Sequence, residues 1–312
     1  MDLSVEIAGL RLRNPVLAAA GTFGYGVEFE DIVEIARLGG IVTKGLSCEP
    51  RSGNAGLRLF ETSAGMLNSI GVQNMGIPAF LETRLPRLRR LGVLVIVNVY
   101  GESVEEYVRA VEMLNEGEGI AAYEINASCP NTRAGGELFA SDPAPLAQLT
   151  AAVKAVTRRP IWIKLSPNVT RIGELARAAE AAGADALSLV NTFLGMAIDV
   201  HTRRPRFANR IAGLSGPAIK PLAVRLVYEA HQAVGLPIIG LGGIASGEDA
   251  VEFLLAGASA IQVGTANFWD PKATESVLRG LEKFCRQRGI PAVRLLTGAL
   301  ENAPPGESEP PV

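Results

Sequence analysis

Residues 161–190 read IWIKLSPNVTRIGELARAAEAAGADALSLV, and this stretch decides the fold. It begins with a short apolar run, Ile161–Leu165, continues through an amphipathic segment, Ile172–Ala182, and ends in a second apolar run, Ala186–Val190. Short β-branched runs predict buried strands, and the segment between these two has helical periodicity. The stretch therefore predicts one β-α-β unit, with parallel strands and a right-handed crossover.

The same unit recurs along the whole chain. The predicted strands are Val16–Ala20, Ile41–Lys44, Val93–Val99, Ala122–Asn126, Ile161–Leu165, Ala186–Val190, Pro237–Leu241 and Ala260–Val263. The predicted helices are Glu30–Leu38, Ala79–Leu91, Val104–Leu114, Pro145–Thr157, Ile172–Ala182, Ile219–Val234, Gly247–Ala256 and Ala273–Arg288. Eight repeats favour closure into a (β/α)8 TIM barrel, an α/β fold. A six-stranded doubly wound sheet is the alternative, and it would leave two strands unexplained.

Segments outside this repeat complete the expected organisation. Residues 5–12 alternate around Ala8–Gly9 and predict a β-hairpin that closes the bottom of the barrel. The connections 46–78 and 193–216 are too long for plain loops, and insertions of that size at the C-terminal mouth are usually functional. We expect a single barrel domain over residues 1–300 and a disordered, proline-rich acidic tail over residues 301–312.

Composition excludes several classes of protein. The 312 residues carry 30 Lys and Arg against 32 Asp and Glu, and without a basic stripe we expect no nucleic-acid partner. No apolar run approaches the roughly 20 residues that cross a membrane, and no signal peptide is visible, so a cytoplasmic protein is expected. The three cysteines form no CxxC pair, which argues against a metal or iron–sulfur site within this chain. With only two histidines, we expect an acid/base group other than histidine.

The predicted strands end in residues suited to binding a phosphate. Gly216, Gly242, Gly243 and Gly264 follow strands 6, 7 and 8, and Thr265 adds a hydroxyl donor. Barrels of this kind hold phosphate there on backbone N–H groups. The alternative is that each glycine simply ends a strand.

Lysines and asparagines follow other strands. Lys44 and Lys164 at strand ends indicate an anionic ligand or carboxylate partners, unless they lean into solvent. A carboxamide both donates and accepts hydrogen bonds, which suits a heterocycle with alternating N–H and C=O groups, although capping and turn formation are the alternative for each asparagine. The asparagines are Asn68, Asn98, Asn126, Asn131 and Asn191.

Cys129 directly follows strand 4 and opens a glycine-containing loop. A positioned, partly shielded thiol can remove a proton next to a carbonyl, so we interpret Cys129 as a candidate base. An inert structural cysteine is the alternative, and it is the interpretation given to Cys48 and Cys285.

Together these motifs resemble those of the dihydroorotate dehydrogenases, FMN enzymes of pyrimidine synthesis, from about Arg13 to Phe268. The matching strings are Thr43–Lys44–Gly45, Met66–Gly71, Asn126–Asn131, Ile163–Asn168 and Asn191–Thr192. The resemblance implies a (β/α)8 barrel with one FMN at its C-terminal mouth, oxidising dihydroorotate to orotate.

Finer features resemble one branch of that family. A cysteine base is typical of class 1, and the strings Glu49–Asn54, Gly71–Asn74 and Leu214–Pro221 are similar to class 1B. That class implies a partner subunit carrying FAD and a [2Fe–2S] cluster, NAD⁺ as acceptor, and a heterotetramer built on a homodimer of catalytic chains. The cysteine count is consistent with this, because the present chain cannot hold such a cluster.

The resemblance also implies roles for single residues. Cys129 would take the C5 proton of dihydroorotate while hydride leaves C6, Lys164 would lie near flavin N1, and Lys44 would contact both flavin and the orotate carboxylate. The implied pyrimidine-binding residues are Lys44, Asn68, Ser69, Ile70, Gly71, Val72, Asn126, Asn131, Asn191 and Thr192. The implied FMN-binding residues are Ala20, Gly21, Lys44, Gly45, Asn98, Asn126, Lys164, Val190, Gly216, Gly242, Gly243, Gly264 and Thr265.

One departure and three rival functions remain, and one of these rivals is a non-catalytic, phosphate-binding barrel without flavin. Many members have serine where this chain has Ala20, so the resemblance implies one hydrogen bond to FMN fewer than in those members, worth about 0.5–1.5 kcal/mol. A class 1A homodimer that uses fumarate would share the same half-reaction. A tRNA dihydrouridine synthase is also a flavin barrel with a catalytic cysteine, but it needs a basic RNA-binding surface.

Overall fold

The computed structural model describes residues 1–127, 139 and 141–301. Eight parallel strands form a closed barrel in the order β10-β15-β16-β3-β4-β7-β8-β9. Their bounds are β3 Val16–Ala18, β4 Gly40–Val42, β7 Val95–Val99, β8 Ile120–Ile125, β9 Ile161–Lys164, β10 Ala186–Leu189, β15 Ile238–Leu241 and β16 Ala260–Val263. The predicted (β/α)8 barrel is therefore confirmed, and the doubly wound alternative is wrong.

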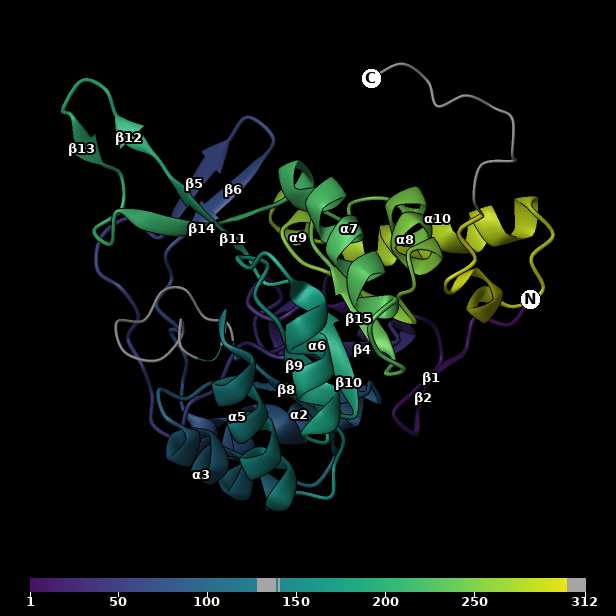
Figure 1. Cartoon of the computed structure of the whole chain (residues 1–312), viewed down its shortest axis with the longest axis horizontal. Coiled ribbons are helices and arrows are strands. Elements are labelled where there is room, and N and C mark those ends of the chain that lie inside the picture. Colours follow the sequence, from purple (N-terminus) through teal and green to yellow (C-terminus); the bar gives the residue numbers. More distant parts are fainter. Residues whose placement is uncertain (128–138, 140, 302–312) are drawn as a thin grey trace.

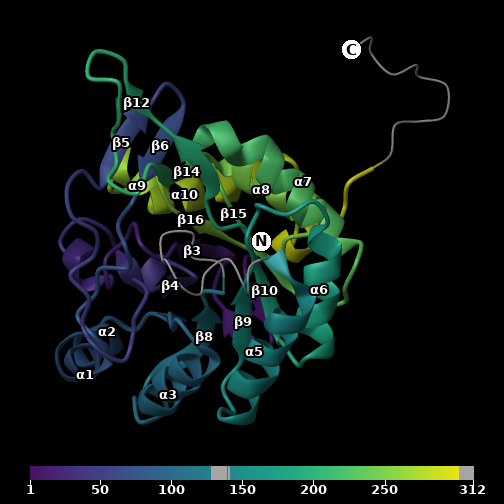
Figure 2. The same ribbon diagram turned by 60° about the vertical axis from the view of Figure 1, so that its left-hand side comes forward.

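Helices cover the outside of this barrel, as Figures 1 and 2 show from two directions. The covering helices are α3 Val104–Asn115, α5 Pro143–Ala155, α6 Ile172–Ala181, α7 Lys220–His231, α8 Gly247–Leu255 and α10 Ala273–Gln287. One further run joins α1 Ile77–Ala79, the π-helical segment η3 Phe80–Arg84 and α2 Leu85–Leu91. Short elements are η4 Pro217–Ile219, α9 Ala266–Trp269 and η5 Val293–Leu296. Because both faces of the barrel wall are covered, its strands consist almost entirely of buried residues.

The helix predicted over Glu30–Leu38 is wrong. The structure has two short 3₁₀ turns there, η1 Val27–Phe29 and η2 Ile35–Arg37. The buried residues Val33, Ile35 and Leu38 are spaced by two and three positions, so an α-helix would not bring all three onto one face.

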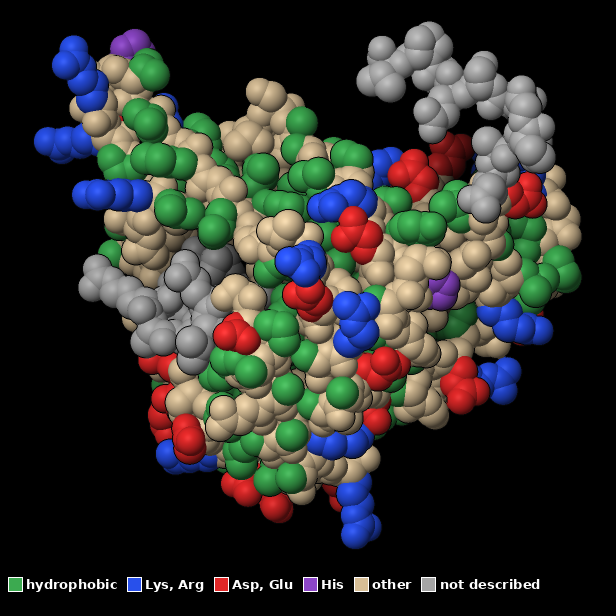
Figure 3. All heavy atoms as spheres, in the orientation of Figure 1, with side chains coloured by type: hydrophobic (Ala, Val, Ile, Leu, Met, Phe, Trp, Pro, Cys, Tyr) green, Lys and Arg blue, Asp and Glu red, His purple; other side chains and the backbone are tan. Residues whose placement is uncertain are grey.

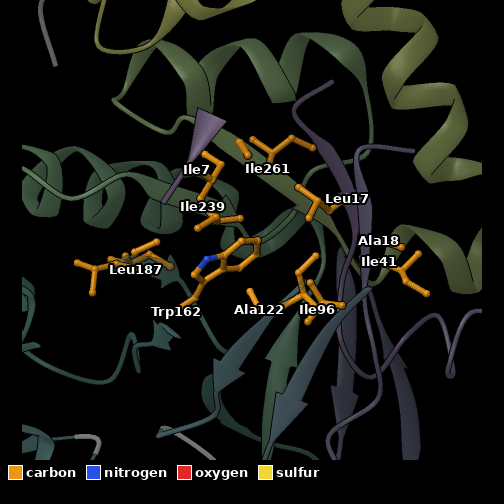
Figure 4. Close-up of a cluster of buried hydrophobic side chains, with 14 of the residues drawn as sticks. Ile7, Leu17, Ala18, Ile41, Ile96, Ala122, Trp162, Leu187, Ile239 and Ile261 are labelled. Atoms are coloured by element: carbon orange, nitrogen blue, oxygen red, sulfur yellow. The ribbon is translucent and has the colours of Figure 1, made fainter. Parts of the chain in front are cut away.

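The N-terminal hairpin pairs β1 Val5–Ile7 with β2 Leu10–Leu12, and the turn residues Ala8 and Gly9 both have positive φ. That turn geometry matches the twist of the flanking strands. Ile7 is fully buried, and Figure 4 shows it beside Ile239, near the Trp162 ring in the barrel core. The hairpin predicted from the sequence is confirmed, and it closes one end of the apolar core.

The two long connections build a second sheet beyond the barrel. Its order is β11-β14-β6-β5, with β5 Leu59–Thr62, β6 Gly65–Asn68, β11 Phe193–Met196 and β14 Ile211–Ser215. Between β11 and β14 the chain extends into a ribbon, β12 Ile198–Asp199 paired with β13 Arg204–Pro205. Figure 1 shows this arm and its sheet across the barrel from β1 and β2. The tail predicted to be disordered lies outside the described residues from position 302 onward.

Candidate active site

A cavity opens at the carboxyl ends of the barrel strands, between the strand ends and the second sheet. Eighteen of the residues singled out from the sequence line it. They are Ala20, Gly21, Lys44, Gly45, Asn68, Ile70, Gly71, Val72, Asn98, Asn126, Lys164, Val190, Asn191, Thr192, Gly242, Gly243, Gly264 and Thr265. Residues spread over most of the chain thus share one cavity, because parallel strands end on the same side of a barrel.

Four other predicted residues are placed differently. Ser69 is buried behind the lining, where its hydroxyl accepts a hydrogen bond from Asn54 Nδ2 at 3.0 Å. Gly216 lies behind Gly243 rather than in the lining. Cys129 and Asn131 fall outside the described residues, so their roles stay predictions.

The floor of the cavity holds a buried ion pair. Lys164 Nζ lies 3.3 Å from Glu124 Oε1, and the two side chains are 7% and 0% exposed. Asn98 Nδ2 also donates to Oε1 at 2.7 Å, and Gln262 Nε2 donates to Oε2 at 2.7 Å. Burial alone would raise the pKa of Glu124, but Lys164 and the hydrogen-bond donors outweigh it and hold that pKa below its ordinary value. The carboxylate is therefore ionised.

Glu124 was missed in the sequence analysis. The signal was an acidic residue inside the apolar strand ending at Asn126, two positions before a residue assigned to the site. Because side chains alternate along a strand, Glu124 and Asn126 share the inner face of the barrel. An acid on that face needs a cationic partner, and Lys164 on the neighbouring strand provides it.

Lys44 is the second lysine at the cavity, and its surroundings differ from those of the ion-paired Lys164. Its side chain lines the cavity, yet within the described part of the chain no carboxylate lies within 4.0 Å of its ammonium group. Burial, and next the positive charge of Arg58, lower the pKa of Lys44. The charge of Glu28 acts in the other direction but lies beyond ion-pair distance. A half-buried ammonium that faces a cavity and has no carboxylate within 4.0 Å among the described residues is suited to an anionic ligand.

Backbone geometry shapes a second corner of the cavity. Gly242 and Gly243 have φ values of 130° and 80°, which side-chain-bearing residues rarely adopt. Among the described residues, no partner accepts a hydrogen bond from the N–H groups of Gly243, Gly264 or Thr265. The Thr265 hydroxyl donates to Ser215 Oγ at 2.8 Å and so is held at the same corner. Free N–H groups beside glycines form a site for a phosphate.

Carboxamides line the remaining wall. Asn191 Nδ2 donates to Asn126 Oδ1 at 3.2 Å, and Asn68 Nδ2 donates to the Gly213 carbonyl at 3.1 Å. The Asn191 Oδ1 atom accepts from the Thr192 N–H at 2.8 Å. These bonds orient the amides around the cavity. A heterocycle with both donors and acceptors could replace them with hydrogen bonds of its own to the same amides.

Further lining residues were not anticipated from the sequence. They are Ala19, Thr22, Leu59, Met66, Gln73, Ser215, Ile219, Leu241 and Phe268. Leu59, Met66 and Ser215 belong to the second sheet, whose pairing could not be read from the chain. The described residues contain no cluster of His, Cys, Asp or Glu that could hold a metal ion, and they include no helix long and apolar enough to span a membrane.

Comparison with known proteins agrees with this geometry. A family model described as dihydroorotate dehydrogenase matches residues 2–285. The chain is 55% identical to a putative dihydroorotate dehydrogenase A (fumarate) of Solibacter usitatus, over 96% of this chain and 99% of the relative. It is 52% and 53% identical to the catalytic subunits of dihydroorotate dehydrogenase B (NAD(+)) of Geotalea uraniireducens and Geotalea daltonii, over 96% of this chain and 98% of each relative. The chain therefore belongs to the dihydroorotate dehydrogenase family.

Proposed function

We propose that this chain binds one FMN and oxidises dihydroorotate to orotate, a step of pyrimidine biosynthesis. The observation that carries the proposal is the Lys44 ammonium, which has no carboxylate within 4.0 Å among the described residues, in a cavity also lined by Asn68, Asn126 and Asn191. A cation beside several carboxamides suits a ring that bears a carboxylate and alternating N–H and C=O groups. Membership of the family supports the same substrate.

The residues present fit FMN. The corner formed by Gly243, Gly264 and Thr265 offers unused N–H groups to the phosphate. Lys164 at the floor offers a fixed positive charge to a flavin ring. Gly45 packs closely against another lining residue, since a Cβ there would lie 2.7 Å from Asn98 Oδ1. Ala20, which also lines the cavity, has no side-chain donor to offer the cofactor.

FMN, when bound, supplies the acceptor for the hydride that leaves C6 of dihydroorotate. The chain's own residues do the rest: Lys44 binds the carboxylate, the amides orient the ring, and Cys129 removes the C5 proton as general base. The Lys164 charge stabilises the negative charge that accumulates beside it. These roles are carried over from the motifs of the family.

For the electron acceptor we propose NAD⁺, reached through a second subunit that carries FAD and a [2Fe–2S] cluster. The names of the Geotalea relatives and the Glu49–Asn54 string support it. The name of the Solibacter relative favours fumarate as the competing acceptor. The enzyme would work in the cytoplasm.

We further propose a heterotetramer of two catalytic and two electron-transfer chains, with the catalytic chains paired. Exposed apolar side chains on the arm support a pairing surface, and Figure 3 shows hydrophobic atoms there beside projecting basic ones. Met196, Ile198 and Val200 are 50%, 55% and 75% exposed. Replacing Met196 and Ile198 together by Glu should therefore shift the catalytic chain toward monomer in sedimentation velocity, and an unchanged dimer would contradict this surface.

An anaerobic titration of the purified, FMN-loaded chain with dihydroorotate tests the reaction. Bleaching of the visible flavin absorption is expected. A yellow protein that does not bleach contradicts the substrate, and a protein that stays colourless after addition of FMN contradicts the cofactor.

The acceptor is tested separately with the reduced protein. Reoxidation by NAD⁺ only in the presence of the second subunit is the expected result. Rapid reoxidation by fumarate without that subunit would instead assign the chain to class 1A.

A further inference from the structure

The ion pair at the floor of the cavity has a member that does not reach the cavity. Lys164 and Asn98 line the cavity, whereas Glu124 lies beneath them and is fully buried. Burying a pair of charges is costly unless the remaining lone pairs are also satisfied. Here both Glu124 oxygens accept hydrogen bonds, from Lys164, Asn98 and Gln262.

The donors come from rigid parts of the barrel. Asn98 on β7 and Lys164 on β9 flank Glu124 on β8, and Gln262 reaches it from β16. A lysine is a flexible chain with a mobile point charge, so its ammonium is held in place only by its partner. Glu124 therefore sets both the position and the charge of the Lys164 ammonium.

We propose that Glu124 is a positioning residue, which keeps the Lys164 ammonium charged and fixed at the cavity floor throughout reduction of the bound FMN. This inference rests on the proposed function, because it requires FMN in the cavity with Lys164 beside the flavin ring.

The surroundings leave Glu124 alone in this role. Among the described residues, the one carboxylate within 4.0 Å of the Lys164 ammonium is that of Glu124, and Lys44 is a second lysine that lines the same cavity. The neighbouring strands β7, β10 and β16 present Asn98, Ser188 and Gln262, which do not titrate. Without the carboxylate, a buried lysine loses its proton more readily.

The consequence is a change in proton balance. If the proposal holds, reduction of FMN bound to the wild-type protein would take up two electrons and one proton, with no proton exchanged at Lys164. In Glu124→Gln, where the carboxylate is absent, we expect reduction also to bring a proton to Lys164 Nζ when negative charge arrives beside it. The equilibrium constant for reduction then changes hundredfold per pH unit instead of tenfold. For a two-electron couple, this means that the midpoint potential changes by about 59 mV per pH unit instead of about 30 mV per pH unit.

The experiment measures the midpoint potential of FMN-loaded protein against pH, from about pH 6 to 9, at an electrode with mediator dyes and without dihydroorotate. We expect the equilibrium constant for reduction to change tenfold per pH unit in the wild type and hundredfold per pH unit in Glu124→Gln. In Glu124→Asp, the tenfold dependence on pH should be restored. Glu275→Gln is the matched control, because it breaks pairs with Arg37 and Arg279 on the outside of the barrel and should keep the tenfold dependence.

Equal dependences in wild type and Glu124→Gln would overturn the proposal. A hundredfold dependence in the wild type would also overturn it, and that measurement stands even where the Gln variant does not fold. If dihydroorotate fails to reduce the FMN, only the proposed substrate is contradicted, whereas a chain that binds no FMN overturns both proposals.

Discussion

Gly243 and Gly216 are in contact at the glycine corner of the cavity: a Cβ atom on Gly243 would lie 2.8 Å from the Gly216 carbonyl oxygen. The same atom would lie 2.8 Å from Lys220 Cβ, at the start of α7. Two loops that follow different strands therefore meet at a separation that only a residue without a side chain permits. This contact places the Gly243 N–H group at the cavity.

Gly243→Ala should weaken FMN binding by about tenfold or more, because the Cβ must displace the Gly216 loop or α7. The Kd is measured by fluorescence titration of the apoprotein. Gly289→Ala is the control: Gly289 also has positive φ, at 65°, but no atom lies within 4 Å of its Cβ position. Both variants should lose about 1–2 kcal/mol of stability from the left-handed backbone, and only Gly243→Ala should lose FMN. Equal FMN affinities in the two variants would contradict this role for the corner.

Cys129→Ala should slow FMN reduction by dihydroorotate about 10²–10⁴-fold, the usual contribution of a general base. Stopped-flow absorbance measures this rate, and FMN content should not change. Cys48→Ala serves as control, since Cys48 does not line the cavity and its thiol donates to the Glu106 carbonyl at 3.7 Å. An undiminished rate in Cys129→Ala would remove this residue from the mechanism.

Lys44→Met should raise the Kd of orotate about 10- to 100-fold, because hydrogen bonds to charged groups contribute about 1.5–3 kcal/mol. The change in flavin absorption on orotate binding reports the Kd. Lys154→Met is the matched control, since it removes a lysine paired with Asp185 at 2.6 Å away from the cavity. If both variants bind orotate as the wild type does, Lys44 is not the anion-binding group.

Orotate affinity should fall as pH rises through the pKa of Lys44, since only the ammonium form attracts the carboxylate. Burial and Arg58 lower that pKa, so the fall should occur at lower pH than for an ordinary lysine. Arg58→Gln removes one of the two causes and should move the fall to higher pH. Arg58→Lys keeps the charge and should leave the midpoint in place. A midpoint that is the same in both variants would show that Arg58 does not act on Lys44.

Glu124→Gln should also reduce the dependence of stability on acid pH. The pKa of Glu124 is lower in the folded protein than its ordinary value of 4.5, so its contribution to stability is present above that value. The contribution is lost as pH falls through the lower, folded pKa. Urea denaturation at several acid pH values should thus show a steeper loss for wild type than for the Gln variant. Parallel curves for wild type and Glu124→Gln would contradict the assignment.

Much of this molecule could be predicted from its sequence because the strand signal is local. Each barrel strand is buried on both faces, so it is a continuous apolar run such as Ile161–Lys164, and a helical pattern follows it. Parallel strands end on one side, which is why the sequence alone assigns Lys44, Lys164 and Asn191 to one mouth. The helix predicted over Glu30–Leu38 was wrong because its apolar residues do not share a helical face.

Other features are set only by contacts between distant segments. The pairing of β6 with β14 joins residues about 145 positions apart, and no local pattern states such a register. Glu124 likewise looked like an ordinary strand residue until Lys164 and Gln262 were seen to contact it. The sequence by itself determined the repeating β-α units, the hairpin and the residues at the strand ends, since these depend on neighbours along the chain. Only the tertiary structure decided which charges are paired, because pairing depends on which strands lie side by side once the barrel closes.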